Sequence, residues 1–266
     1  MDNEIHGAVA PGFDWVREEF AAVVAEENGE SGAQLAAFVH GELVVDLWAG
    51  PQVTGDTSTG LLSSTKGVSS LVVALLLQEG WLDLDRTVAD YWPEFGSAGK
   101  TAITLRQVLT NRAGVIGVDG GFTIAELADD RRIAERVATQ WPHIRPNSAQ
   151  AYGGFVTFAI IGEVVRRAAG GSIQGIAYNL HAAGFTPVDV LTLPNDPGVR
   201  ALGQGSAGGV GSARGLAAIY AAAISGHAPL LQADTLAAVT AVHSTDPDLV
   251  RGDRAPYALG CCTTRS

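Results

Sequence analysis

Residues 68–77 (VSSLVVALLL) constrain the fold most, because they are apolar on nearly every face of a helix. A helix that is hydrophobic all round lies in a protein core or spans a membrane. The most apolar part, residues 71–77, is far shorter than the roughly 20 residues that cross a bilayer. We therefore predict a central, buried helix, capped by Ser63 or Ser64 and ended by Gly80.

The segments around this helix predict a mixed fold. Apolar residues recur at helical spacing over residues 13–25, with acidic residues between them, which is typical of an amphipathic helix. Residues 33–39 and 42–48 are rich in β-forming side chains and are joined by His40 and Gly41, so we expect an antiparallel hairpin. The expected class is α/β (α+β), with a sheet-bearing lobe and a helical lobe. Further helices are expected over residues 82–92, 104–109, 124–138, 155–169 and 213–223.

Composition and charge limit the possible domain organisation, partners and location of the protein. With 47% hydrophobic residues, the chain can bury a real core. We expect one domain over all 266 residues, with a helix and hairpin in 1–62, a mainly helical lobe in 63–225 and an incomplete return to the sheet in 226–266. The formal charge of −11 disfavours nucleic acid and anionic membranes as partners. The acidic N-terminus shows no export signal, and the adjacent Cys261 and Cys262 offer no disulfide framework, so a cytoplasmic location is expected.

The tetrapeptide from Ser63 to Lys66 (SSTK) carries the candidate chemistry. Its first and last residues are three apart, so in a helix their side chains share one face. A serine hydroxyl needs a base within reach before it can attack a carbonyl, and Lys66 can serve only as a neutral amine. Burial and the helix dipole both favour that form. Only Lys66 and Lys100 are lysines among 17 basic residues, which suggests a need for an amine. The alternative is a helix-capping serine in a common tetrapeptide.

Other polar residues carry weaker signals. Tyr152 stands in a glycine-rich loop before a predicted helix, where a phenol can relay protons or simply pack the loop. His143 lies nine residues earlier and either lines the cleft or stays exposed, the second being the more common for a loop histidine. The six histidines show no metal-binding spacing, so neither a metal nor a cofactor is expected. The glycine-rich residues 203–211 lack the lysine of a phosphate loop and are expected to cross close to other backbone.

Many stretches together resemble the serine β-lactamase-related family, in particular carboxylesterases similar to class C β-lactamases and penicillin-binding proteins. The resemblance covers most of residues 7–225. It implies a β-lactamase/transpeptidase-like fold, with Ser63 as the acylated nucleophile, Lys66 as its base and Tyr152 as a second general acid/base. The matching stretches are residues 9–13, 41–48, 63–68, 80–85, 91–95, 112–114, 152–167 and 208–220.

Two departures from the family pattern shape the expected activity. Gly154 stands where the family often has an asparagine, which favours an esterase over a β-lactamase; with His143, Gly154 is our candidate for contacting substrate. The family also has a late strand motif, Lys-Thr-Gly or His-x-Gly, that supplies one of two oxyanion donors, the other being the Ser63 N–H. Residues after 225 show no match to it, so the resemblance implies a C-terminally truncated member. Loss of one oxyanion donor typically costs about a hundred- to a thousandfold in rate.

These observations predict a serine hydrolase that acts on ester bonds, or amide bonds, through an acyl-enzyme on Ser63. The first alternative is a catalytically impaired, truncated remnant of the family. The second is a β-lactam-reactive or D-Ala-D-Ala peptidase-like enzyme. The expected partners are a small-molecule ester or amide and, through an exposed sheet edge, a second copy of the chain.

Overall fold

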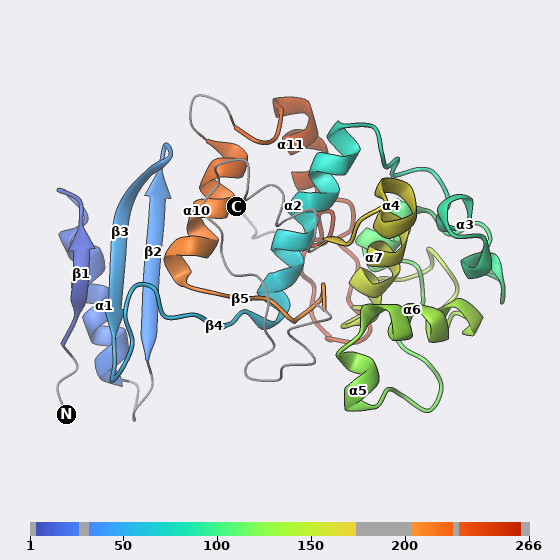
Figure 1. The fold of residues 1–266 in the computed structure, drawn as a ribbon, viewed down its shortest axis with the longest axis horizontal. Coiled ribbons are helices and arrows are strands. Elements are labelled where there is room, and N and C mark those ends of the chain that lie inside the picture. The colour runs from blue at the N-terminus through green and yellow to red at the C-terminus, as the bar shows by residue number, and fades with distance from the viewer. Residues whose placement is uncertain (1–3, 27–31, 174–203, 226–228, 262–266) are drawn as a thin grey trace.

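A short antiparallel sheet opens the fold (Figure 1). Strand β3 (Glu42–Ala49) lies in its centre, with β1 (His6–Val9) on one side and β2 (Ala33–Val39) on the other. The β2–β3 hairpin turns at His40 and Gly41, whose positive φ angles of 53° and 86° are those of a tight hairpin turn. The sequence predicts this hairpin to within one residue, whereas it does not predict β1. The computed structural model describes residues 4–26, 32–173, 204–225 and 229–261.

Helix α1 (Asp14–Glu26) covers one face of this sheet, as the sequence predicts to within one residue. Every second residue of β3 points toward it, because side chains alternate between the two faces of a strand. The helix and the sheet therefore share a small apolar core of their own. Its buried members are Phe20, Val24, Val45, Leu47 and Ala49.

Helix α2 (Thr65–Gln78) is the predicted central helix, and nine of its residues are buried. A 3₁₀ turn, η1 (Leu62–Ser64), precedes it, and Gly80 follows its end with φ at 75°, a left-handed conformation that glycine adopts without strain. Ser64 is the residue before the helix, but its side chain makes no capping hydrogen bond. The prediction of a serine cap is therefore wrong in its chemistry, and Ser63 belongs to the 3₁₀ turn.

Most of the remaining helices, including α7 (Val156–Ala169), form the helical lobe. Two of the predicted helices are wrong in extent. In residues 82–92 only the last turn is helical, because Asp83 accepts a hydrogen bond from the Asp85 N–H in a turn and Thr87 starts a new helix. Residues 124–138 are broken where the side chain of Asp129 caps a second helix. The helices are α3 (Val88–Tyr91), η2 (Pro93–Gly96), α4 (Leu105–Leu109), α5 (Ile124–Leu127), α6 (Asp130–Thr139), α10 (Ala213–Ile224) and α11 (Ala233–Thr240).

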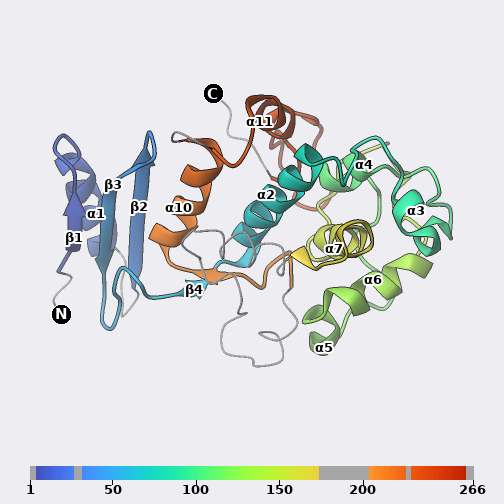
Figure 2. The same ribbon diagram turned by 45° about the horizontal axis from the view of Figure 1, so that its top comes forward.

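Helix α10 lies between the sheet and the helical lobe, with β2 on one side and α2 on the other (Figures 1 and 2). A two-stranded ladder of β4 (Thr59–Gly60) and β5 (Val210–Gly211) runs between the lobes, beside the start of α2. Residues 229–261 add α11 and bridges but no strand of the sheet, and β2 pairs only with β3 in the described part of the chain. Pairing of this edge with a second copy stays a prediction. No helix in the described ranges has the length and apolarity to cross a membrane.

Candidate active site

Three of the predicted site residues meet at the start of α2. The Tyr152 hydroxyl lies 2.9 Å from Ser63 Oγ, and Lys66 Nζ lies 3.2 Å from the same oxygen. The η1 turn leaves Ser63 exposed, while the first turn of α2 places Lys66 three residues later on the same face. The serine hydroxyl is therefore open to solvent on one side and touched by two proton-transfer groups on the other.

Lys66 is buried, with 7% of its surface exposed. Burial disfavours the ammonium form and lowers the pKa of Lys66, while the hydrogen bond and charge of Tyr152 and the charge of Asp130 oppose that shift. Its Nζ donates to the carbonyl oxygen of Ser206 at 2.8 Å. The amine also lies 5.2 Å from the centre of the Tyr152 ring. Lys66 is thus fixed in place and shifted toward the neutral state that a base requires.

Two buried residues hold the segment that carries Tyr152. On one side, Asn111 Oδ1 accepts hydrogen bonds from the Gly153 N–H and the Thr157 hydroxyl. On the other side, Asp248 Oδ1 accepts the Tyr152 N–H at 3.2 Å. The sequence analysis misses both residues. An asparagine just after a predicted helix is a helix-end signal, and Asn111 indeed has a left-handed φ of 55°, but nothing in the local sequence marks Asp248.

The glycine-rich segment 204–211 packs against the first turn of α2. The Gly209 N–H donates to Thr65 Oγ1 at 2.9 Å, and its carbonyl accepts the Leu61 N–H at 2.8 Å. A side chain at Gly209 would collide with Thr65, because a Cβ there would lie 2.7 Å from Thr65 Oγ1. The prediction that this segment crosses close to other backbone is confirmed. Its last two residues, Val210 and Gly211, form strand β5.

The two predicted substrate-contacting residues differ in their settings. No atom lies within 4 Å of the position that a Cβ would take at Gly154, so this residue faces open space two positions after Tyr152. His143 is exposed, and its Nε2 lies 3.3 Å from Asp119 Oδ1 rather than near the hydroxyl cluster. Contact of either residue with substrate stays a prediction. Among the described residues, no group of three or more His, Cys, Asp or Glu side chains is placed to hold a metal ion.

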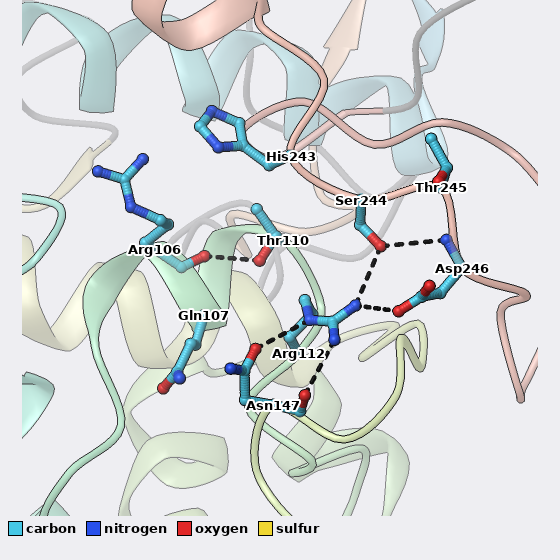
Figure 3. Close-up of a pocket in the computed structure, with 9 residues that line it drawn as sticks. All are labelled: Arg106, Gln107, Thr110, Arg112, Asn147, His243, Ser244, Thr245 and Asp246. Carbon is cyan, nitrogen blue, oxygen red and sulfur yellow. Dashed lines mark hydrogen bonds and ion pairs between the residues drawn. The ribbon is translucent and has the colours of Figure 1, made fainter.

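A polar pocket of about 390 Å³ lies elsewhere, and Ser63, Lys66 and Tyr152 are not among the residues that line it (Figure 3). Arg112 lies at its centre and binds both Asn147 and Asp246. Arg106, also in the lining, forms a two-bond ion pair with Asp85. Because both guanidinium groups already bind carboxylates, we interpret this pocket as part of the packing between segments and assign it no ligand.

Comparison with known families agrees with this fold. The model of the family described as Beta-lactamase matches residues 18–180, more than half of the chain. The chain therefore belongs to the beta-lactamase family, and its fold is the β-lactamase/transpeptidase-like fold of helices packed with an antiparallel sheet.

Individual relatives are named as esterases and as penicillin-binding protein homologues. The chain is 34% identical over 145 residues to the esterase/beta-lactamase LipL of Mycobacterium tuberculosis, a match that covers 52% of this chain and 33% of LipL. It thus spans about a third of that relative's length. The structure of EstA from Arthrobacter nitroguajacolicus Rue61a superposes with a TM-score of 0.84 at 31% identity, covering 97% of this chain and 82% of EstA. A penicillin-binding protein homologue from Caulobacter crescentus gives a TM-score of 0.88 at 27% identity, covering 97% and 83%.

Proposed function

We propose that this protein is a serine hydrolase that cleaves small-molecule esters through an acyl-enzyme on Ser63. The observation that carries the proposal is the shared contact of Ser63 Oγ with Lys66 Nζ at 3.2 Å and the Tyr152 hydroxyl at 2.9 Å. A nucleophile within hydrogen-bond reach of its base is the geometry that activates a serine. The names of the esterase relatives support the same chemistry.

The reaction follows from the three side chains. The Ser63 oxygen attacks the ester carbonyl carbon while its proton passes to neutral Lys66, which becomes an ammonium. The carbonyl oxygen gains the negative charge, for which the Ser63 N–H is our candidate donor. The intermediate collapses, the bond to the alcohol breaks, and Tyr152 protonates the departing alkoxide, with Lys66 restoring the phenol proton. Water then attacks the acyl-enzyme by the same steps in reverse order, releasing the acid and free Ser63.

Gly154, beside Tyr152, favours an ester substrate over a β-lactam or a peptide. Gly154 offers no side-chain amide to bind a substrate's amide group, and the space beside it is open. Ester cleavage requires no amide recognition and releases an alkoxide, which leaves more readily than an amine anion. The β-lactam-reactive alternative is therefore the weaker one and is tested in the same experiment.

The test is intact-mass spectrometry after exposure to a fluorophosphonate probe and, separately, to penicillin. We expect one phosphonyl adduct on Ser63 and little or no penicillin adduct. Ser63→Ala should abolish the adduct and lower the hydrolysis of a p-nitrophenyl ester by about a thousandfold or more, because the nucleophile is lost. Ser64→Ala is the matched control, since it removes an adjacent exposed hydroxyl that makes no capping bond.

Each other outcome has a definite meaning. An adduct that persists in Ser63→Ala would contradict the assignment of the nucleophile. No adduct on wild-type protein with a folded far-UV spectrum would support the impaired remnant instead of an active hydrolase. A stoichiometric penicillin adduct on Ser63 would move the substrate class from esters to β-lactams.

A further inference from the structure

The carboxyl group of Asp130 approaches the site from the far side of the 204–207 turn. Asp130 is the first residue of α6, and both of its oxygens are used by the turn. Oδ2 accepts the Gly205 N–H at 2.7 Å, and Oδ1 accepts a hydrogen bond from Gln204 Nε2 at 3.0 Å. Asp130 forms no ion pair within the described residues. Its carboxyl therefore has one set of partners, the backbone and side chain of this turn.

Residues 204–207 hold Lys66 through the Ser206 carbonyl. The Gln204 amide that binds Asp130 through its nitrogen accepts the N–H groups of Ser206 and Ala207 through its oxygen, at 3.1 and 2.6 Å. This locks the turn so that the Ser206 carbonyl points at Lys66 Nζ, 2.8 Å away. One continuous set of hydrogen bonds thus runs from Asp130 to the amine.

A purely structural role as a helix cap does not account for Asp130. The residue that caps α6 is its neighbour, whose side chain accepts the Arg131 N–H. The Asp130 carboxyl points the other way, into the protein, where burial raises its pKa to about 7. Asp130 is half-buried, and a carboxyl that turns inward with no helix to cap needs another reason to be there.

The geometry points to Asp130 as a positioning residue for the base, which holds the Ser206 carbonyl against Lys66 and favours the ammonium form of Lys66 through its own negative charge. This inference rests on the proposed function, because it assigns a role toward the base of that reaction. It adds a fourth side chain, from α6, to the cluster of Ser63, Lys66 and Tyr152.

The charge of Asp130 changes the pKa of Lys66 in a definite direction. The Asp130 carboxylate raises the pKa of Lys66, against the larger effect of burial, and the Lys66 ammonium lowers the pKa of Asp130 in return. The other ionisable group facing Lys66 is Tyr152, and Arg251 lies 5.9 Å above the Tyr152 ring. On its own helix, Asp130 is faced by Asp129, whose charge raises the pKa of Asp130. Protonation of Asp130 therefore favours the neutral amine.

The test is the second-order rate of Ser63 phosphonylation by a fluorophosphonate, measured between pH 5 and 10. The rate requires neutral Lys66, so in the wild type it rises with pH through the lysine titration. In Asp130→Asn the negative charge is absent, and we expect the midpoint of this rise to move to lower pH. We also expect the high-pH plateau to fall about tenfold, because an asparagine oxygen can keep only one of the two bonds to the turn.

Ser69→Ala is the matched control. The Ser69 hydroxyl, on α2, donates to the Gly205 carbonyl at 2.8 Å, so its loss loosens the same turn without changing any charge. We expect a lower plateau and an unchanged midpoint. If Asp130→Asn keeps the wild-type midpoint, or if Ser69→Ala shifts it equally, the inference is overturned. Failure of the proposed function is distinct, because it would show as no labelling of the wild type at any pH.

A measurement on the unsubstituted protein covers the case in which Asp130→Asn does not fold. Because the chain has only two lysines, a sample labelled with ¹³Cε-lysine gives two resonances, and loss of one in Lys66→Ala assigns the other to Lys100. The Lys66 resonance should show a second inflection near pH 7, where Asp130 titrates. A single inflection, belonging to Lys66 alone, would contradict coupling between the two groups.

Discussion

The two lysines of the chain are both buried, but their hydrogen-bond partners favour different charge states. Lys100 Nζ donates to the carbonyl oxygens of Ser97, Ala138 and Gln140 at 3.0, 3.1 and 2.5 Å. Three acceptors match the three N–H bonds of an ammonium, so Lys100 can stay charged even though burial lowers its pKa to about 8. Lys66 contacts one carbonyl, and its other partners are the hydroxyls of Ser63 and Tyr152, which can also donate to a neutral amine. Lys100 is therefore a structural cation, and Lys66 is free to lose its proton.

Lys100→Met should destabilise the protein without touching the active site. The methionine fills similar space but takes the ammonium away from three carbonyls. The oxygens of Ser97 and Ala138 keep the residue-100 N–H and the Ser97 hydroxyl as donors, whereas the Gln140 oxygen loses its donor, so the free energy of unfolding should fall by about 1–3 kcal/mol. Urea denaturation followed by circular dichroism measures this. Arg132→Met, which removes an exposed cation of the helical lobe, should change the same quantity by less than about 0.5 kcal/mol. Equal effects of the two substitutions would show that the carbonyl cluster contributes little.

At this scale the sequence predicts only what helical geometry dictates. The contact between Ser63 and Lys66 follows from their spacing at the start of a helix. Tyr152 lies 89 residues from Ser63, and its place in the cluster came from family resemblance, not from periodicity. Asp130 and Asp248 act across 75 and 96 residues on backbone N–H groups, for which a local sequence carries no signal. Side chains that position others through tertiary contacts are thus the part that sequence reasoning misses.

Among the elements, the β4–β5 ladder fixes the start of α2. It pairs Thr59 with Gly211 and Gly60 with Val210, directly before the η1 turn. The neighbouring Gly209 lies against Thr65, so the segment and the first turn of α2 are in direct contact. Any displacement of this segment is expected to move the Ser206 carbonyl relative to the amine that it binds.

Gly209→Ala should therefore lower both stability and labelling. Its Cβ would lie within 2.7 Å of Thr65 Oγ1, and overpacking of this kind costs about 1–3 kcal/mol. We expect Ser63 phosphonylation to slow about tenfold or more, because a small displacement of Lys66, the proposed base, is costly to the rate. Gly117→Ala is the control, since no atom lies within 4 Å of a Cβ there. If Gly209→Ala labels at the wild-type rate, the contact does not position the site.

Elements with strong periodicity or a clear turn are predicted well, and those decided by polar side chains are not. The hairpin and α2 agree with the structure because their apolar pattern and the positive-φ turn leave few alternatives. Residues 82–92 and 124–138 contain apolar residues at helical spacing, but hydrogen bonds of Asp83 and Asp129 to nearby backbone N–H groups interrupt the helices. Strand β1 is four residues long and forms only because β3 offers an edge, a tertiary fact that its own sequence does not record.

In the whole molecule, separate apolar clusters serve the sheet and the helical lobe, and they share no buried residue. Helix α10 connects them, because it packs on β2 and also contributes Ala223 to a third cluster with α2 (Figure 1). Its first two residues, Ala213 and Arg214, make polar contacts with the sheet. The Ala213 N–H donates to Gln34 on β2, and Arg214 binds Asp46 on β3 as well as Asp56. The sheet thus contacts α10 by packing along β2 and by polar bonds at the first turn of the helix.

Arg214→Met should weaken the sheet and leave the helical lobe intact. The substitution removes the cation that binds Asp46, whose side chain is only 17% exposed, so a partly buried carboxylate loses its partner. Because the two apolar clusters are separate, we expect the sheet to open locally rather than together with the lobe. Hydrogen exchange read by mass spectrometry should show faster exchange in peptides from β2 and β3 and unchanged exchange in α2. Arg132→Met should change neither region, and equal acceleration of both in Arg214→Met would mean that the molecule unfolds as one cooperative unit.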